Sequence, residues 1–352
     1  MISQDQINEL SRIWEIDKDT VLREYIQVVF LSIFYTHKQS EKNYFKGGTA
    51  IRLLFGGERF SADLDFSTKL SFSELKNLLY KTLKNINLII PVISFKKINI
   101  GNKSLKAVLS YQSNAMQYPL TIDLDFSHRE KPFTSEETIL NSDFPINSRS
   151  VIRHLGWSEI LSEKISAFVC RAKGRDVFDF WYLLDKGINI DWKMVNKKLK
   201  FYNKTANIST IINKIARFDD KKIKNDLEKF LPKHNRNLAV NVKKMLLDKL
   251  CSIKEFNIKD SQDLSYSRMP GGSFHKTEKL IYDLDKTKII LMTRENENKL
   301  RVDIITQDNG KRHGWIRVKA KAGIRKLDII EKNKSKFKNK SYNYLINHKF
   351  SD

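Results

Sequence analysis

The sequence is poor in cysteine, with only Cys170 and Cys251 among its 352 residues, and the two do not form a Cys-x-x-Cys pair. A disulfide framework or a zinc site is therefore not expected, and a reducing cytoplasm suits such a chain. Long apolar runs are also missing, because the longest candidate, residues 28–35, is far too short to span a bilayer. Residues 1–5 contain no basic region leading into an apolar stretch, so we expect no signal peptide there and a cytoplasmic protein without a membrane segment.

Negative charge becomes scarce toward the C-terminus. Residues 1–190 hold 25 Lys and Arg against 22 Asp and Glu, whereas residues 191–260 hold 18 against 8 and residues 261–352 hold 21 against 11. Most of the formal net charge of +23 therefore lies in the second half of the chain. Such an excess favours a polyanionic partner, and nucleic acid is the first candidate. The alternative, which the high content of Asn, Lys and Ile keeps open, is a lysine-rich proteome in which lysine only fills solvated faces.

Residues 44–66 carry the most informative pattern. Gly47 and Gly48 form a turn where the backbone can come close to a phosphate, because neither residue has a Cβ. On the strand expected after it, Asp63 and Asp65 are two residues apart, so both side chains leave the same face. Spacing and alternation here predict an extended run at 44–46, a helix at 49–55 ended by Gly56-Gly57, and a strand at 62–66.

Two carboxylates on one strand face repel each other unless a cation neutralises them. Ligands that are all oxygen favour Mg2+ or Mn2+, and Mg2+ commonly binds one or two carboxylates together with substrate phosphates. A phosphate cradle followed by a metal-binding Asp-x-Asp is the layout of a nucleotidyltransferase. The alternative is a solvated strand face after a loop. A P-loop is excluded, because no Gly-Lys-Ser/Thr follows the glycines.

The same stretch resembles the AbiEii/AbiGii toxin family of nucleotidyltransferases, which is part of the DNA polymerase β-like superfamily. The superfamily pattern is a Gly-Gly or Gly-Ser turn, a spacer, and then Asp-x-Asp or Asp-x-Glu on a strand. The form found here, Ser61-Ala62-Asp63-Leu64-Asp65-Phe66, is close to the AbiEii version, although the spacer of residues 49–62 is at the long end of the usual range.

A second block, residues 158–184, reads as two helices in succession. It resembles the AbiEii pattern Glu-x-x-x-x-Lys followed by Arg-x-Lys-x-Arg-Asp-x-x-Asp. The matching residues are Glu159, Lys164, Arg171, Lys173, Arg175, Asp176 and Asp179. The resemblance implies that Lys164 contacts the nucleotide phosphates and that Asp176 completes the site. For Arg175 and Asp179, an ion pair on the helix surface is the alternative.

A third block, residues 119–126, alternates like a strand, with Asp123 and Asp125 on one face and apolar residues on the other. Members of the superfamily carry a third carboxylate on a strand beside the first Asp-x-Asp. Asp123 matches that position best, Asp125 is its close rival, and a second polar strand face is the alternative. The resemblance thus implies metal binding by Asp63, Asp65 and Asp123, and nucleotide binding by Gly47, Gly48, Thr49, Ser61, Lys164 and Arg171.

The chain divides into three expected parts. The resemblance implies an α+β fold in which a polymerase β-like mixed sheet with helices, the nucleotidyltransferase core, spans residues 1–150. A helical domain that completes the active site spans residues 151–260, and a Pro-Gly-Gly linker precedes a small basic β-rich domain of unknown role at residues 273–352. We further expect helices at 4–14, 21–36 and 71–86 and through the Lys-rich stretch 188–259. Strands are expected at 88–100, 104–112, 279–284, 288–294, 299–306 and 313–321, and a loop is expected at 128–148.

These patterns predict a metal-dependent nucleotidyltransferase that moves NMP from an NTP to an acceptor. The resemblance implies the toxin of a toxin–antitoxin or abortive phage infection system, paired with an AbiEi-like antitoxin, with RNA such as tRNA as the acceptor. One alternative is a catalytically silent nucleic-acid-binding module, which the intact Asp63, Asp65 and Lys164 argue against. Another is transfer to a small molecule or a protein, and the basic C-terminal half argues instead for a polyanionic acceptor. The identity of the NTP and of the acceptor stays open.

Overall fold

The computed structural model describes residues 1–113, 116–146, 150–255, 276–284, 287–296, 299–308 and 311–321. The chain divides into two compact units, Met1–Leu247 and Asp248–Asp352. Domain boundaries near residues 150 and 260 stay a prediction. Within the described ranges, none of the helices has the length and apolar character needed to cross a membrane.

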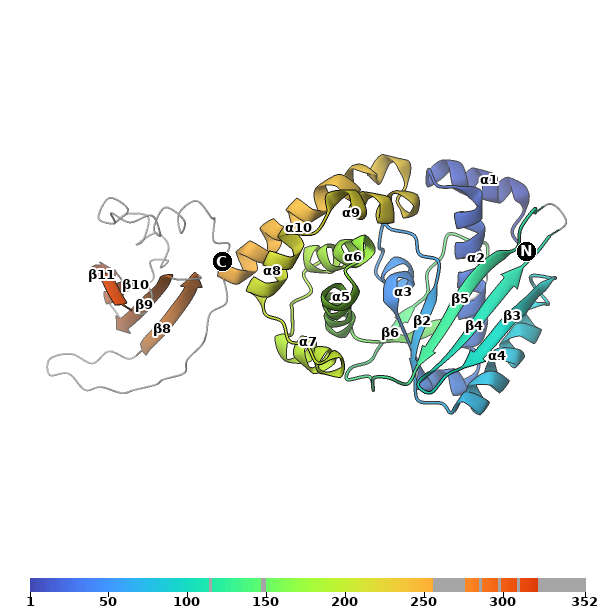
Figure 1. The fold of residues 1–352 in the computed structure, drawn as a ribbon, viewed down its shortest axis with the longest axis horizontal. Coiled ribbons are helices and arrows are strands. Elements are labelled where there is room, and N and C mark those ends of the chain that lie inside the picture. The colour runs from blue at the N-terminus through green and yellow to red at the C-terminus, as the bar shows by residue number, and fades with distance from the viewer. Residues whose placement is uncertain are drawn as a thin grey trace. The chain divides into compact units, whose positions relative to one another are not determined.

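The first unit is built on a mixed seven-stranded sheet with the strand order β3-β4-β5-β2-β1-β7-β6 (Figure 1). Its strands are β1 Asn43–Lys46, β2 Leu64–Thr68, β3 Ile93–Ile100, β4 Ser104–Tyr111, β5 Leu120–Ser127, β6 Glu136–Ile139 and β7 Val151–His154. β2 runs parallel to β5 and antiparallel to β1, so the two strands associated with paired aspartates are direct neighbours. A mixed sheet with helices confirms the expected α+β fold class.

One face of this sheet is apolar and packs against α2. Phe66 of β2 and Phe126 of β5 stack with ring centroids 4.5 Å apart, and both rings contact Phe34 of α2. The helices of this layer are α1 Gln4–Ile13, α2 Lys18–Phe34 and α4 Phe72–Ile86, with α1 and α4 both packed on α2. Ser71 and Glu74 form a capping box that starts α4, a helix expected from the sequence. Because apolar residues of β2 and β5 turn toward α2, the alternating aspartates are left on the opposite face.

A second group of helices in the first unit forms a bundle to one side of the sheet (Figure 1). They are α5 Trp157–Arg171, α6 Gly174–Asp185, α7 Trp192–Leu199, α8 Ile208–Ala216 and α9 Asp220–Leu227, followed by α10 Asn237–Glu255, which continues past the unit boundary. α5 packs against α6 and α7, and α6 packs against α9. α8 buries Ile208, Ile211 and Ile215, and the helices α7 to α10 lie in the Lys-rich stretch where helices were expected.

The second unit contains a four-stranded antiparallel sheet with the order β11-β10-β9-β8. Its strands are β8 Lys276–Leu284, β9 Thr287–Asn296, β10 Lys299–Asp308 and β11 Lys311–Lys321, and all four were expected from the sequence. The predicted Pro-Gly-Gly linker and the end of the predicted basic domain beyond residue 321 lie outside the described residues.

Two local expectations are wrong. Residues 128–148 are not all loop, since β6 lies within this stretch. It pairs with β7, a strand that was not expected from the sequence. β6 is a short edge strand with three exposed residues, so it shows no apolar alternation and only its pairing defines it. Residues 88–92 form a turn and β3 begins only at Ile93, because Pro91 offers no N–H and Val92 has a φ of 62°.

Candidate active site

Strand register gathers the predicted carboxylates. Lys46 of β1 lies opposite Asp65 of β2, and Asp65 lies beside Asp125 of β5. Residues paired in this way project from one face of a sheet, here the face opposite α2. Asp63 directly precedes β2, and its carboxylate interacts electrostatically with that of Asp123 on β5. The structure thus brings four aspartates and one lysine together.

The first two aspartates are costly to ionise. Burial raises the pKa of Asp63, and the carboxylate of Asp123 adds to the increase. Burial also raises the pKa of Asp65 to about 6, even though Lys46 and Lys164 favour its ionised form. More positive charge than the protein itself supplies is therefore needed to keep both carboxylates ionised at low cost.

The aspartates of β5 differ in their surroundings. Asp123 is exposed, whereas Asp125 is half-buried and its Oδ1 is buried without a hydrogen-bond partner. The nearest cation to Asp125 is Lys106, whose Nζ lies 3.6 Å from Oδ2. A buried acceptor without a partner calls for an explanation, and a bound cation is one. Both positions therefore stay candidates for the third carboxylate.

The aspartate side chains of this face are chemically suited to bind a hard divalent cation. Within the part of the chain that the structure describes, no three Asp, Glu, His or Cys side chains already converge as a metal site. The donors that line this face are all carboxylate oxygens, which Mg2+ and Mn2+ prefer. A cation would relieve the repulsion between Asp63 and Asp65 and would give Asp125 Oδ1 a partner.

The two glycines open helix α3, Gly47–Leu54, directly beside the carboxylates. Gly47 has a φ of 82°, and a Cβ there would lie 2.3 Å from Asp65 Oδ2. A Cβ on Gly48 would lie 2.3 Å from Arg59 Nη2 and 3.0 Å from Ser61 Oγ. Because the first N–H groups of a helix have no partner within it, this close-fitting helix start is suited to a phosphate.

Thr49 and Ser61, both predicted to bind nucleotide, sit in different situations. The Thr49 hydroxyl is buried and donates to the carbonyl oxygen of Asp63, so this side chain ties α3 to the strand that follows. Ser61 is half-buried beside Gly48, and its carbonyl oxygen accepts a hydrogen bond from Gln27 Nε2 at 3.0 Å. Of the two hydroxyls, that of Ser61 is the better placed for a ligand.

Replacing Gly47 by alanine tests how closely the helix start and Asp65 fit. The added Cβ would displace Asp65 and force a positive φ on a residue with a side chain. We expect Gly47→Ala to lower NMP transfer about a hundredfold, since a displacement near 1 Å at a reacting centre has an effect of that order. The control is Gly101→Ala, where a Cβ would contact only Ser104 O at 3.5 Å. Equal transfer rates in the two variants would contradict the close fit.

A buried ionic triad holds Lys164 beneath the site. Asp179 of α6 accepts two hydrogen bonds from Arg59, at 2.9 and 2.7 Å, and its Oδ2 lies 2.6 Å from Lys164 Nζ. Burial opposes the ionised form of Asp179, but the two cations lower its pKa to about 2. The alternative of an exposed Arg175–Asp179 ion pair is wrong, since Asp179 is buried and its oxygens face Arg59 and Lys164.

Arg171, Arg175 and Asp176 lie nearby. The buried carboxylate of Asp176 accepts two hydrogen bonds from Arg171, both at 2.9 Å, while Arg171 keeps about half of its side chain exposed. Arg171 also interacts electrostatically with Asp65. Arg175 lies over the Phe230 ring, 4.9 Å from its centroid, and its charge favours the ionised form of Asp63. Asp176 therefore orients Arg171, and the two arginines add positive charge beside the carboxylates.

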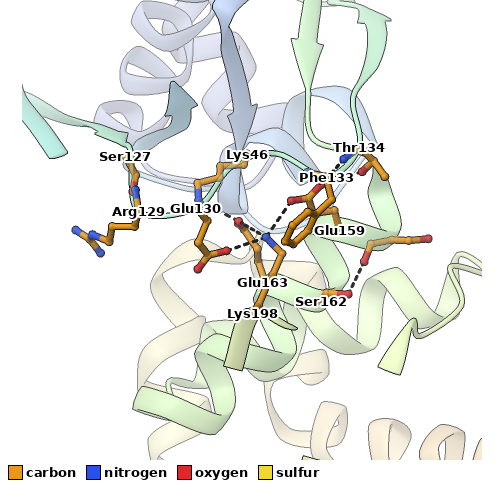
Figure 2. A network of polar contacts seen from close by, with 11 residues as sticks. Lys46, Ser127, Arg129, Glu130, Phe133, Thr134, Glu159, Ser162, Glu163 and Lys198 are labelled. Atoms are coloured by element: carbon orange, nitrogen blue, oxygen red, sulfur yellow. Dashed lines mark hydrogen bonds and ion pairs between the residues drawn. The ribbon is translucent and has the colours of Figure 1, made fainter. Parts of the chain in front are cut away.

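A second charge network lies behind Lys46 and is shown in Figure 2. Glu163 of α5 shares one oxygen between Lys46 and Lys198 of α7, each 3.1 Å away. Lys198 also reaches Glu159 at 3.0 Å and Glu130 at 2.9 Å. Burial opposes ionisation of Glu163, but the two lysines lower its pKa to about 2. The network therefore joins the strand before Gly47 to α5, α7 and the loop after β5.

Several residues of these networks were missed in the sequence. Arg59 and Glu163 flank recognised motifs, and Lys46 immediately precedes the glycines, so closeness to a motif was the available signal. Lys198 lies in a Lys-rich helix where nothing separates it from its neighbours. Glu159 belongs to the AbiEii pattern, and its carboxylate accepts hydrogen bonds from the backbone of Phe133 and Thr134 as well as from Lys198.

Comparison with known proteins gives one family. The model of the nucleotidyl transferase AbiEii toxin of type IV toxin–antitoxin systems matches residues 29–249. No curated protein sequence matches the chain. Among solved structures, the chain is similar to MenT4, a nucleotidyltransferase toxin from Mycobacterium tuberculosis, with 17% identity and a TM-score of 0.49 over 71% of this chain and 90% of that one. It is also similar to JHP933 from Helicobacter pylori, with 20% identity and a TM-score of 0.42 over 68% of this chain and 96% of that one.

Proposed function

Since the chain belongs to the AbiEii family of nucleotidyltransferase toxins, we propose that its aspartate face is the site that transfers NMP from an NTP to an RNA acceptor. Membership makes the chain a nucleotidyltransferase and implies an NTP substrate and an antitoxin partner. The finer assignments are Asp63, Asp65 and Asp123 as ligands of Mg2+ or Mn2+, an AbiEi-like antitoxin, and a cytoplasmic location. The observation that carries the proposal is the register that sets Asp65 beside Asp125 and opposite Lys46.

The surrounding residues have distinct roles in this proposal. The open N–H groups at the start of α3 bind the triphosphate, and Gly47 lets it approach because no Cβ stands between helix and carboxylates. Lys164 and Arg171 offset phosphate charge from the side of α5, and Asp179 and Asp176 hold them in place. A bound divalent cation would neutralise the carboxylates and stabilise charge on the phosphates and the acceptor oxygen.

The acceptor is proposed from charge. Residues 191–260, which include the helices that follow the site, carry 18 Lys and Arg against 8 Asp and Glu. A polyanion is the acceptor that such a surface favours. In this scheme residues 1–150 form the core, residues 151–260 complete the site, and the basic residues 273–352 have an undefined role.

A labelling experiment tests the proposal. Purified protein is incubated with each of the four α-32P-labelled NTPs, Mg2+ and one of three acceptors: total RNA, total protein, or a pool of small molecules. We expect label in the RNA and none with Asp63→Ala. Label confined to protein or to small molecules would overturn the RNA acceptor, and RNA binding without any transfer would favour a silent binding module.

Metal binding should depend on pH. Because the pKa of Asp65 is raised to about 6, the folded protein without a cation binds more protons than the unfolded chain between about pH 4 and pH 6. The free energy of unfolding therefore falls as the pH rises through this range, and it stays lower above pH 6. Mg2+ binds the ionised carboxylates, so its stabilising effect should be larger at pH 7.5 than at pH 5. At a hundredfold excess over Kd, we expect an increase in melting temperature of about 5–10 °C at pH 7.5.

The control for this measurement is Asp65→Ala, which should lose most of the Mg2+ effect at both pH values. An equal shift at pH 5 and pH 7.5, or an unchanged shift in the variant, would contradict the assignment of Asp65 as a ligand.

A further inference from the structure

We propose that the turn after α7, residues 200–204, is a platform on which a single-stranded stretch of RNA stacks. This inference rests on the RNA acceptor proposed above and names where on the surface that acceptor is held. The turn presents two aromatic rings, Phe201 with 58% of its surface exposed and Tyr202 with 47%. We call residues 200–204 the aromatic turn.

The aromatic turn is anchored at both ends. Before it, Lys198 and Leu199 are both buried, and Lys198 makes the ion pairs with Glu130, Glu159 and Glu163. After it, Asn196 closes the loop by exchanging hydrogen bonds with the backbone of Ala206, at 3.0 and 2.9 Å. The two rings are therefore exposed on a segment that its neighbours hold in place.

The backbone of the turn itself is also closed. Residues Lys200–Tyr202 form one turn of 3-10 helix, and Asn203 ends it in the left-handed region with a φ of 52°. The Asn203 amide donates to Lys200 O, and the Lys204 amide donates to Leu199 O, each at 3.1 Å. Both aromatic side chains of this short closed turn keep about half of their surface or more exposed, and this exposure costs free energy unless a partner covers them.

The charge around the rings matches a nucleic acid. Three exposed lysines lie within four residues of Phe201 along the chain: Lys197, Lys200 and Lys204. From Trp192 to Thr205 the chain contains no acidic residue. Aromatic rings between solvated lysines suit a single strand, whose bases stack on the rings while its phosphates meet the lysines. A duplex offers no free base faces to stack, so the single-stranded form fits better.

The aromatic turn is linked to the aspartate face. Lys197 Nζ lies 3.9 Å from the ring centroid of Phe133, in the loop that follows β5, and Lys198 holds Glu130 of the same loop. Figure 2 shows Glu130 pointing into the network, while Arg129 points away from it. Arg129 and Lys131 are exposed. A basic path thus leads from the aromatic turn over this loop to the strand that carries Asp123 and Asp125.

The test compares two matched surfaces of the full-length protein. Phe201→Ala/Tyr202→Ala removes the platform, and Tyr80→Ala removes a ring on α4 that is 49% exposed and lies on the layer packed against the other face of the sheet. Binding of a fluorescein-labelled single-stranded RNA 12-mer is followed by anisotropy, and melting curves check folding. We expect the double variant to bind at least about tenfold more weakly, because each stacked base contributes about 1–3 kcal/mol, and Tyr80→Ala to bind like wild type.

Charge is tested in the same assay at several salt concentrations. Lys200→Ala/Lys204→Ala should make the log–log salt slope shallower by about 1.4, since each contact with single-stranded phosphate contributes about 0.7. Lys76→Ala/Lys84→Ala, on exposed positions of α4, is the control and should leave the slope unchanged.

Failure of this inference can be told apart from failure of the proposed function. If wild type transfers NMP to RNA while Phe201→Ala/Tyr202→Ala and Tyr80→Ala bind RNA equally well, the platform is wrong and the function stands. If Phe201→Ala/Tyr202→Ala keeps its RNA affinity but no longer binds the antitoxin, the surface is a protein interface and the platform is again wrong. If wild type neither labels nor binds RNA, the RNA acceptor is wrong and the platform falls with it.

Discussion

Asp63→Ala should lower NMP transfer at least about a thousandfold, because a metal ligand at a phosphoryl-transfer site contributes several kcal/mol to stabilising the transition state. The carboxylate lies beside Asp123 and within electrostatic reach of Arg175. Transfer of label from an NTP to RNA, at saturating NTP and Mg2+, measures the effect. A rate within a few-fold of wild type would show that Asp63 is not a metal ligand.

The same variant should fold normally. Burial and Asp123 raise the pKa of Asp63, so the ionised side chain costs free energy in the protein without a cation, and its removal relieves that cost. We therefore expect a melting temperature at pH 7.5 and without Mg2+ that is no lower than that of wild type. Asp123→Ala and Asp125→Ala in the same two assays decide which residue is the third carboxylate. The variant that lacks the third carboxylate should lose NMP transfer, and the other variant should keep most of it.

Asp179→Ala should have the largest effect on stability. It would leave Arg59 and Lys164 buried without their common counter-ion, and breaking a buried pair by removing one partner costs about 3–5 kcal/mol. Urea unfolding monitored by circular dichroism measures the loss. The control is Glu137→Ala, which breaks an exposed ion pair with Arg153 and should cost less than about 1 kcal/mol.

The pH dependence of wild type provides an independent check on Asp179. Its folded-state pKa is about 2, below the ordinary value of about 3.9, so its contribution is fully present above pH 4 and is lost as the pH falls toward 2. Asp179→Ala should remove this part of the acid sensitivity. A variant as stable as Glu137→Ala, with an unchanged acid profile, would contradict a counter-ion role.

The strands that carry the aspartates could be predicted from the sequence, because alternation alone assigns each residue to a face. Leu64 and Phe66 are fully buried, as their positions opposite Asp65 require. The helices α5 and α6 were equally predictable, since each is longer than three turns with a continuous apolar pattern. Alternation cannot state which strand lies next to which. The resemblance implied that the strand with Asp123 lies beside the strand with Asp63 and Asp65, and the structure adds the parallel register of β2 and β5.

The partners of buried charges were the least predictable part of the site. Asp179 looked like one half of a helix-surface pair with Arg175, because i, i+4 spacing is visible in a sequence. Its actual partner Arg59 is 120 residues away, and no local pattern reports a contact of that separation. Lys198 is a similar case, because its burial depends on three glutamates from two other segments.

The separation between Arg59 and Asp179 has a consequence for how the protein is made. A ribosome adds about 5–20 residues per second, so roughly 6–24 seconds pass between synthesis of Arg59 and synthesis of the carboxylate 120 residues later. During that interval the four aspartates and then Lys164 are added in turn, while Arg59 still lacks the counter-ion that it later shares with Lys164. A chain released before Asp179 is added would thus carry all four aspartates without the carboxylate that holds Arg59 and Lys164.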